Sequence, residues 1–487
     1  MLEPGESLTH KVIKGGLWIF LARGLVQFTG IINSIILARL LAPSDFGLMG
    51  IALMTLGVLQ GFTNMGLKEA LIQRKGDLGE HLDVAWTISI VRGLFLFLII
   101  FLLAPFVAHF FENPKAASVI RVVSLSQFFS GFNNIGVVYF MKDLDFRKQF
   151  IYDLSGTLTN VLVAIPLAYV IGSVWALVFG LLSSSVATAI ASYIVHPYRP
   201  SLRFNLEKIK DLVNYGKWIT VSQIFLIVLS RGDSGLVGKV LGTTALGFYQ
   251  LAYKFATIPV TEITQAAYKL TFPVYTHLQD NVERLRMGYL RTLRFISFIS
   301  APLTAGMFIM APDFVRVFLG DKWAAAVSCM QVLSLYGFAL SISANTGPLF
   351  QAVGRPNLVT KIVFLRLIIT GALLYPFSLW WGITGTAIAV LVSALIMDPI
   401  AFYEVIKIIE CDTMEFCKIV FAPVVNSLVM VFFVAAMKKY FMGQIHIPGF
   451  FLIVILGGLC YLAISYITQE DFRDLIRYRP YRKEQIT

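Results

Sequence analysis

Charged side chains stand inside several of the longest apolar runs of this chain, where they are suited to binding an ion or an ionic group. A charge at mid-bilayer costs at least about 2.5–3.5 kcal/mol on insertion scales, so such a side chain normally faces a cavity or a partner. Arginine offers a planar fork of donors that binds phosphate or carboxylate oxygens in pairs, whereas a carboxylate can take up a proton or a cation. Six residues have this placement: Arg23, Arg92, Arg231, Lys254, Asp233 and Glu262.

The first apolar run places its arginine on a narrow face of a helix. At 100° per residue, one sector holds small and polar residues, namely Gly16, Arg23, Gln27, Gly30, Ser34 and Ala38. Close helix packing would explain the small residues, but it does not explain Arg23 and Gln27. We therefore expect this face to line a polar cavity and to bind substrate, with Asn33 and Asn64 as further candidates in the same half of the chain.

A similar face recurs in the second half of the chain, with Gly216, Thr220, Gln223, Ser230, Ser234 and Gly238. Arg231 lies about 80° from the middle of this face and is long enough to reach a cavity, whereas Asp233 points away from it. Residues two apart on a helix do not face each other, so Asp233 needs another partner. Lys254 on the next helix is one candidate; a protonation or cation-coupling role and a buried structural ion pair are the others.

Two further intramembrane charges have weaker assignments. Glu262 lies near the middle of its run and is a second candidate for ion coupling. Arg92 lies near one end of its run, where a long side chain can extend to the membrane surface, and we favour this interpretation for it.

Composition indicates the elements that must position these residues. Of 487 residues, 57% are hydrophobic and only 14% are charged, and the mean hydropathy is +0.75, whereas soluble domains contain about 25% charged residues. Long apolar runs recur along the whole chain, many near the roughly 20 residues that cross a bilayer as a helix. The sequence therefore predicts an all-α polytopic membrane protein with about fourteen transmembrane helices, at 12–40, 46–69, 84–110, 118–140, 151–171, 174–195, 212–240, 246–272, 289–311, 325–350, 358–378, 383–404, 418–437 and 448–467.

The distribution of basic residues predicts the orientation. The net charge of +12 comes from residues in short polar gaps, which argues against a nucleic-acid partner. Alternate gaps hold 28 and 8 of the 40 Lys and Arg residues, and the richer set contains both termini. Because basic gaps stay on the cytoplasmic side, we expect both termini to be cytoplasmic. The first run is too long for a removable signal peptide, so we expect it to remain as the first span.

An internal repeat appears when the sequence is shifted on itself so that position 16 meets position 216. "GLWIF" at Gly16 then aligns with "GKWIT" at Gly216, and "ARLLAPSDFGLMGIA" at Ala38 with "GKVLGTTALGFYQLA" at Gly238. Six helices separate the copies, so the two halves have equal orientation, as in transporters with a cavity between parallel repeats. The expected organisation is an N-lobe (1–200), a C-lobe (201–410), two extra helices (411–470) and a basic cytoplasmic tail (471–487).

Motifs for enzymatic chemistry do not stand out. The chain has no GxxxxGK[ST] phosphate loop, no HExxH and no GxSxG, and its longest polar gap is about 20 residues. Four cysteines and six histidines are scattered without ligand spacing. We therefore expect no metal, no cofactor and no enzyme activity.

The repeated turns resemble a known family. "ILARLLAPSDFGLMGIA", "GLKEALIQRK", "GKVLGTTALGFYQLAYKFATIPV" and "FPVY" are similar to the polysaccharide-transporter branch of the multidrug/oligosaccharidyl-lipid/polysaccharide exporter superfamily. Within that branch the chain most resembles the Wzx-type lipopolysaccharide biosynthesis flippases, in particular the colanic and teichuronic acid exporter group. The resemblance covers essentially the whole chain, and its specific part is the pair of repeated turns.

The resemblance implies two six-helix lobes around a central cavity and transfer of a polyprenyl-diphosphate-linked oligosaccharide across the bacterial cytoplasmic (inner) membrane. It implies that Arg23 binds the diphosphate, with Arg231 and Lys254 as less direct counterparts in the second half. Membrane lipids, a polysaccharide polymerase and glycosyltransferases are the implied partners.

Two other functions stay open. A cation-coupled multidrug antiporter of the same superfamily would use acidic groups to bind the cation. The intramembrane acidic residues Asp233 and Glu262 are consistent with this alternative. An integral-membrane polysaccharide polymerase or acyltransferase would ordinarily carry a large extracytoplasmic loop with clustered reactive groups, and the outer gaps here are short.

Overall fold

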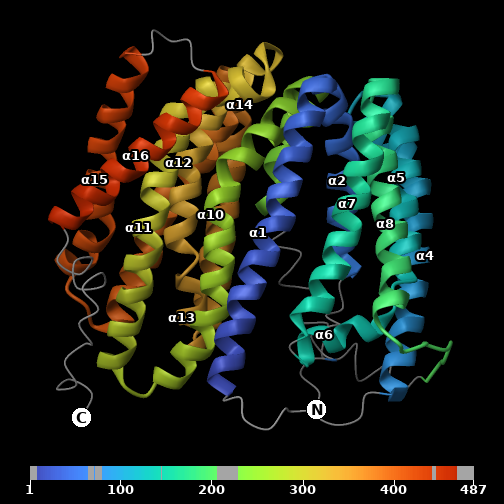
Figure 1. Ribbon diagram of the computed structural model, residues 1–487, viewed down its shortest axis with the longest axis horizontal. Helices are drawn as coiled ribbons and strands as arrows, with labels where there is room; N and C mark the ends of the chain where they lie inside the picture. The colour runs from blue at the N-terminus through green and yellow to red at the C-terminus, as the bar shows by residue number, and fades with distance from the viewer. Residues whose placement is uncertain are drawn as a thin grey trace. The chain divides into compact units, whose positions relative to one another are not determined.

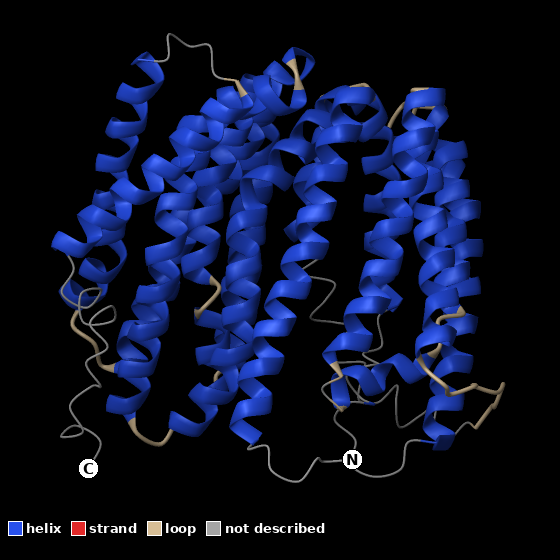
Figure 2. Ribbon diagram, viewed as in Figure 1, coloured by secondary structure: helices blue, strands red, loops and turns tan. Residues whose placement is uncertain are grey.

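The computed structural model describes residues 8–63, 71, 79–143, 145–205, 229–440 and 446–468, and within these ranges the side chains from residue 24 onward except those at 79–80, 262–263 and 265–270. Helices dominate these residues, and no strand occurs among them (Figure 2). The chain forms two compact units that divide between Gln250 and Leu251. The predicted all-α architecture is therefore confirmed for the described part of the chain.

The first unit is built from long helices, and the described turns between α1 and α2, α4 and α5, and α7 and α8 are short (Figure 1). Pairs of these helices pack through small residues. A methyl group on Gly93 of the third long helix would lie 2.7 Å from the carbonyl oxygen of Gln127 on the next helix, and such close backbone approach is typical of membrane helices. The helices are α1 (Leu8–Leu40), α2 (Pro43–Thr63), α4 (Gly79–Phe110), α5 (Lys115–Gly131), the 3₁₀ turn η1 (Ile135–Val137), α6 (Val138–Lys142), α7 (Phe146–Ile171), α8 (Trp175–Val195), a helical stretch at 229–240 and the start of α10 (Thr243–Leu278).

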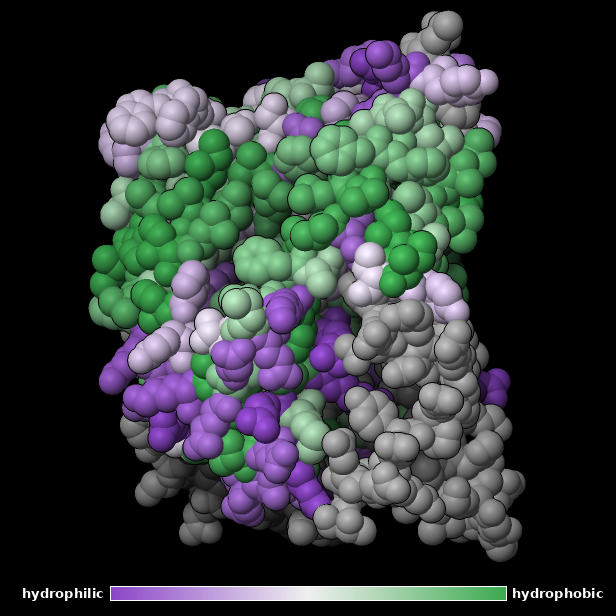
Figure 3. All heavy atoms as spheres, turned by 90° about the vertical axis from the view of Figure 1, so that its left-hand side faces the viewer, coloured by the Kyte–Doolittle hydropathy of each residue, from purple (hydrophilic) through white to green (hydrophobic). Residues whose placement is uncertain are grey.

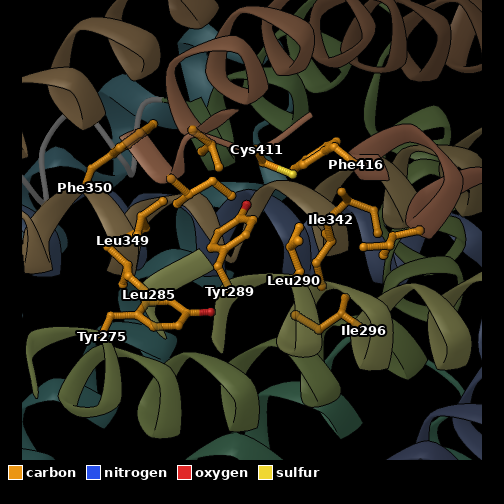
Figure 4. Close-up of a cluster of buried hydrophobic side chains, with 14 of the residues drawn as sticks. Tyr275, Leu285, Tyr289, Leu290, Ile296, Ile342, Leu349, Phe350, Cys411 and Phe416 are labelled. Atoms are coloured by element: carbon orange, nitrogen blue, oxygen red, sulfur yellow. The ribbon is translucent and has the colours of Figure 1, made fainter. Parts of the chain in front are cut away.

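The second unit contains the rest of α10 and the helices that follow. One buried cluster joins residues of α10 to α15 and includes the rings of Tyr275, Tyr289 and Phe416 (Figure 4). The ring centre of Tyr289 lies 6.0 Å from that of Tyr275 and 6.5 Å from that of Phe416. The remaining elements are α11 (Val282–Phe314), a π-helical turn η2 (Val315–Leu319), a 3₁₀ turn η3 (Asp321–Ala326), α12 (Val327–Ser343), α13 (Thr346–Ala352), α14 (Pro356–Ile409), α15 (Thr413–Tyr440) and α16 (Ile447–Thr468).

The helices have the length and surface of membrane spans. Within the described residues, nine helical stretches are long and apolar enough to cross a bilayer. Large apolar side chains lie on their outer surfaces; Phe432 of α15, for example, is 75% exposed. One face of the second unit shows a band of hydrophobic residues with hydrophilic residues below it (Figure 3). The chain is thus a polytopic membrane protein, while the count of fourteen spans stays a prediction.

Two predicted helices end or break at different places, and a further pair of predicted spans agrees with the structure. The span expected at 118–140 ends at Gly131, because Asn134 accepts a hydrogen bond from the Gly136 amide and starts a new 3₁₀ turn. The span expected at 325–350 breaks around Asn345 into α12 and α13. α14 contains both spans expected at 358–378 and 383–404, with its backbone reversing at Trp381 and Gly382, where Gly382 has φ +57°.

A reciprocal contact inside the first unit joins positions that are counterparts in the predicted repeat. A methyl group on Gly47 of α2 would overlap the carbonyl oxygen of Thr243, and one on Gly247 of α10 would overlap the carbonyl oxygen of Pro43. Positions 43 and 47 thus exchange roles with their repeat counterparts, positions 243 and 247. A two-fold relation between the turns predicts this exchange.

The turn between α4 and α5 also bonds to residues 239–243. Lys239 forms an ion pair with Glu112 at 2.6 Å, and the Asn113 amide donates a hydrogen bond to the Thr243 hydroxyl at 2.9 Å. Residues 229–250 therefore pack with the first unit, and the structural division after Gln250 falls later in the chain than the lobe boundary predicted at position 200. The predicted lobe limits remain a prediction.

Candidate functional site

Arg231 and Asp233 lie on the helical stretch 229–240 and have different surroundings. Arg231 is exposed, and a methyl group on Gly57 of α2 would lie 3.9 Å from its Nε atom. The guanidinium thus lies beside α2, and it makes no hydrogen bond or ion pair with any residue that the structure describes. This is the environment of a cation that can receive an anionic ligand.

Asp233 is buried and already has hydrogen-bond donors. Its carboxylate accepts bonds from the Tyr249 hydroxyl at 2.7 Å and from the Ser234 amide at 2.6 Å. These bonds satisfy the Asp233 carboxylate, for which the sequence alone could not assign a partner. They favour a structural role, and ion coupling by Asp233 remains a prediction.

The candidates on α1 lie beside α7. Asn33 donates a hydrogen bond from its amide nitrogen to the amide oxygen of Asn160 at 2.7 Å, which joins the two helices. Ser34 is buried and bonds to the carbonyl of Gly30, and Gln27 is half-buried. The Asn33–Asn160 pair favours helix packing over substrate contact for Asn33.

Other candidates are placed only in part. Lys254 lies on α10 in the second unit, where its side chain is exposed and interacts with neighbouring groups. Arg23 and Glu262 belong to α1 and α10, but their side chains are outside the described residues, as is Asn64 altogether. The structure therefore places Arg231 beside α2 in the first unit. It does not show how the other predicted site residues lie relative to Arg231.

Arg92 has a defined role that the sequence interpretation missed. Its guanidinium donates to the Thr63 hydroxyl at 3.1 Å and to the Gln60 carbonyl at 3.4 Å, in the last turn of α2. Gln60 in turn donates to the Gln127 amide oxygen on α5 at 2.7 Å. The side chain joins three helices and binds a carbonyl near a helix end, where a cation is favoured; it does not simply extend to the surface.

An intramembrane ion pair was also missed. Arg366, which lies inside the span expected at 358–378, is part of α14 and donates to the carboxylate of Asp398. Both side chains are largely buried, with 13% and 7% exposure. The available signal was one arginine and one aspartate in neighbouring apolar runs.

Metal and redox chemistry find no support among the described residues. No group of three His, Cys, Asp or Glu side chains there could hold a metal ion, and all four cysteines are free. Burial, followed by the nearby Glu415 carboxylate, raises the pKa of the Cys411 thiol to about 11, so this thiol is a poor nucleophile at neutral pH.

An apolar helical scaffold, an internal parallel repeat and an exposed intramembrane arginine define a polytopic membrane protein of transporter type. The chain belongs to the family described as "Polysaccharide biosynthesis protein", whose sequence model matches residues 36–328. This membership confirms the family resemblance seen in the repeated turns.

Individual relatives agree with the family. The chain is 24% identical over 409 residues to the lipopolysaccharide biosynthesis protein WzxC of Escherichia coli K12, covering 82% of each chain. It is 24% identical over 360 residues to the teichuronic acid biosynthesis protein TuaB of Bacillus subtilis 168, covering 72% of this chain and 73% of TuaB. The lipid II flippase MurJ in an inward closed conformation shares the fold, with a TM-score of 0.75 and 15% identity over 95% of this chain and 100% of the MurJ chain.

Proposed function

We propose that this protein is a flippase that transfers a polyprenyl-diphosphate-linked oligosaccharide across the bacterial cytoplasmic membrane for surface polysaccharide biosynthesis. Membership of the polysaccharide biosynthesis family and the named roles of WzxC, TuaB and MurJ support this substrate class. The protein acts as a transporter, not as an enzyme, and both of its termini are cytoplasmic.

The observation that carries the proposal is the exposed guanidinium of Arg231 beside α2. A cation at this position binds an anion more strongly than it would in bulk water, because the surrounding helices lower the local dielectric constant. A diphosphate offers oxygens for paired hydrogen bonds with arginine. Arg23 on α1 and Lys254 on α10 supply further positive charge in this proposal.

The transport cycle proceeds by alternating access. The diphosphate and sugar head enters the polar cavity while the prenyl tail stays in the bilayer, and a conformational change then exposes the head on the outer side. Energy comes from the membrane potential, a coupled ion or consumption of the product outside. A polysaccharide polymerase and glycosyltransferases act on either side of this step.

The cation-coupled antiporter is the second candidate, and buried Asp233 is the observation that supports it. A membrane-buried carboxylate that binds protons would couple export to the proton gradient. The exposed arginine and lysine favour the anionic lipid head instead. Loss of drug resistance with normal surface glycan, after removal of Asp233, would favour the antiporter.

The test measures lipid-linked oligosaccharide on the cytoplasmic side by mass spectrometry, together with surface glycan. Arg231→Gln and Arg23→Ala should each cause accumulation of the lipid-linked intermediate and at least a tenfold loss of surface glycan, and the Lys variants should recover part of it. Arg121→Gln is the matched control, since this exposed arginine lies over the Phe101 ring at 5.2 Å, away from the proposed site. Normal glycan in Arg231→Gln and Arg23→Ala, at unchanged protein level, would refute the diphosphate contact.

A further inference from the structure

A short segment after α8, residues 196–204, lies against the end of the first unit; we call it the strap (Figure 1). The carboxylate of Asp83, near the start of α4, accepts hydrogen bonds from the Tyr198 hydroxyl at 2.6 Å and from the Ser201 amide and hydroxyl at 2.9 and 2.8 Å. Arg203 forms an ion pair with the same carboxylate at 3.4 Å, and its amide donates to the Thr87 hydroxyl at 3.0 Å. One buried acid thus holds three residues of the strap.

These bonds determine which side chains of the strap face outward. Neighbouring side chains of an extended chain point to opposite sides. Because Ser201 and Arg203 face Asp83, Leu202 and Phe204 must point away from the unit. They are 64% and 74% exposed, which places two large apolar side chains on an outer surface.

The strap lies at the level where the lipid-facing surface of α8 ends. Ile190 and Ile194, one turn apart near the end of α8, are 56% and 78% exposed, so that surface continues to the last turn. Tyr193 and Tyr198 flank this point, and tyrosine is enriched at the water–lipid boundary. The strap begins directly after α8 and runs along the outside of the unit, near the ends of α4 and α8 (Figures 1 and 2).

Basic groups lie within the strap and on the start of α7. Arg199 is exposed; its guanidinium lies 5.9 Å from the centre of the Tyr193 ring and donates to the carbonyls of His196 and Tyr198. Arg147, at the start of α7, is also exposed. Burial, and then the charges of Lys148 and Arg199 acting against that of Asp143, lower the pKa of His196. Arg199 and Lys148 thus place positive charge near His196, and Asp143 opposes it.

We propose that the strap is a binding surface for anionic phospholipid of the adjacent leaflet. Leu202 and Phe204 enter the boundary between headgroups and acyl chains, and Arg199 and Arg147 bind the headgroup phosphates. Basic residues beside an anionic surface each strengthen binding, and aromatic and apolar side chains add the buried area.

Spin labels on the full-length protein test the depth of the strap, in nanodiscs that contain two parts of phosphatidylcholine to one part of phosphatidylglycerol. With the four native cysteines replaced, Leu202→Cys and Phe204→Cys should carry labels that are more accessible to oxygen than to a soluble nickel complex. Ser118→Cys, exposed beyond the start of α5, is the control and should show the reverse. Labels at 202 and 204 that are open to nickel, or that are covered only after a cytosolic protein is added, would overturn the proposal.

Headgroup preference is measured on the same full-length protein, by native mass spectrometry with added phosphatidylglycerol and phosphatidylcholine. Wild type should retain phosphatidylglycerol preferentially, and Arg199→Gln with Arg147→Gln should lower that preference about fivefold for each arginine removed. Arg121→Gln, remote from the strap, should leave it unchanged. Equal retention of both lipids by wild type, or an equal loss in Arg121→Gln, would overturn the assignment to anionic lipid.

Discussion

Buried ionic side chains in the second unit show how a membrane helix hairpin is held together. Three polar pairs join the two halves of α14 around the reversal at Gly382. Beyond the Arg366–Asp398 pair, the Thr370 and Ser393 hydroxyls lie 2.6 Å apart, and those of Ser378 and Thr386 lie 2.8 Å apart. Of the three pairs, the ion pair should cost the most stability when it is broken, because the remaining buried charge has neither its partner nor water.

Removing one member of the Arg366–Asp398 pair should destabilise the protein. Arg366→Met leaves the Asp398 carboxylate buried without its cation, and we expect a loss of about 3–5 kcal/mol. Arg366→Met with Asp398→Leu should recover most of that loss, since no unpaired charge remains. Unfolding in detergent, followed by fluorescence, measures both variants.

Equal losses in the single and double variants would contradict a simple ion pair. Lys361→Met is the matched control, because this lysine is exposed on the same half of α14. Its effect on stability should be within about 0.5 kcal/mol.

The sequence located most charges in apolar runs but could not assign their partners. Arg92 bonds to Thr63 on another helix, and Asp233 to Tyr249 one helix later. Hydropathy reports how deep a residue lies, and the helical wheel reports its direction. Neither reports which neighbouring helix meets that face, so the pairing of Arg366 with Asp398, each inside its own apolar run, could not be predicted.

At the scale of elements, the crossing of α2 and α10 depends on two glycines related by the repeat, Gly47 and Gly247. Their Cβ positions are occupied by backbone carbonyls of the opposite turn, which cannot rotate away as a side chain can.

The ion pair of Glu112 with Lys239 lies nearby, and the hydrogen bond from Lys239 lowers the pKa of Glu112. This pair is therefore complete at neutral pH and is lost only when the pH falls through that lowered pKa.

Alanine at Gly47 should push the two turns apart. Overpacking of this kind costs about 1–3 kcal/mol, and we expect a lower melting temperature for Gly47→Ala and for Gly247→Ala. Gly371→Ala is the matched control, because nothing lies within 4 Å of its Cβ position in α14. In an open helix position alanine is favoured over glycine by about 1 kcal/mol, so the control should keep or raise the melting temperature. Equal behaviour of all three variants would show that the crossing is not tight.

Helix positions followed from the sequence more closely than helix ends. Apolar length predicted nearly every long helix, because a bilayer requires about 20 apolar residues. The ends depend on local bonds: Asn134 starts a turn with its own side chain, and hydropathy does not record such a bond. The reversal of α14 at Gly382, in contrast, lies in the gap predicted between 378 and 383.

At the scale of the whole molecule, the repeat and the basic residues describe the same organisation. Positions 47 and 247, counterparts in the predicted repeat, meet in the structure. Basic residues gather in alternate gaps, and the predicted even number of spans would return the chain to its starting side. The gap after α4 belongs to the basic-poor set, and the gap before α11 belongs to the basic-rich set.

These two gaps provide a test of orientation in intact cells. In a background without the native cysteines, Ser118→Cys, after α4, should react with a membrane-impermeant maleimide, and Asn281→Cys, before α11, should react only after permeabilisation. Both positions are exposed, so accessibility reflects the side of the membrane and not burial. The physical reason is that Lys and Arg near spans resist translocation, whereas gaps with few of them cross. The opposite labelling pattern would show that the orientation is the reverse of the predicted one, so that the diphosphate would have to enter from the outer side. Labelling of both positions in intact cells would show that the two gaps lie on the same side and that a span between them is absent.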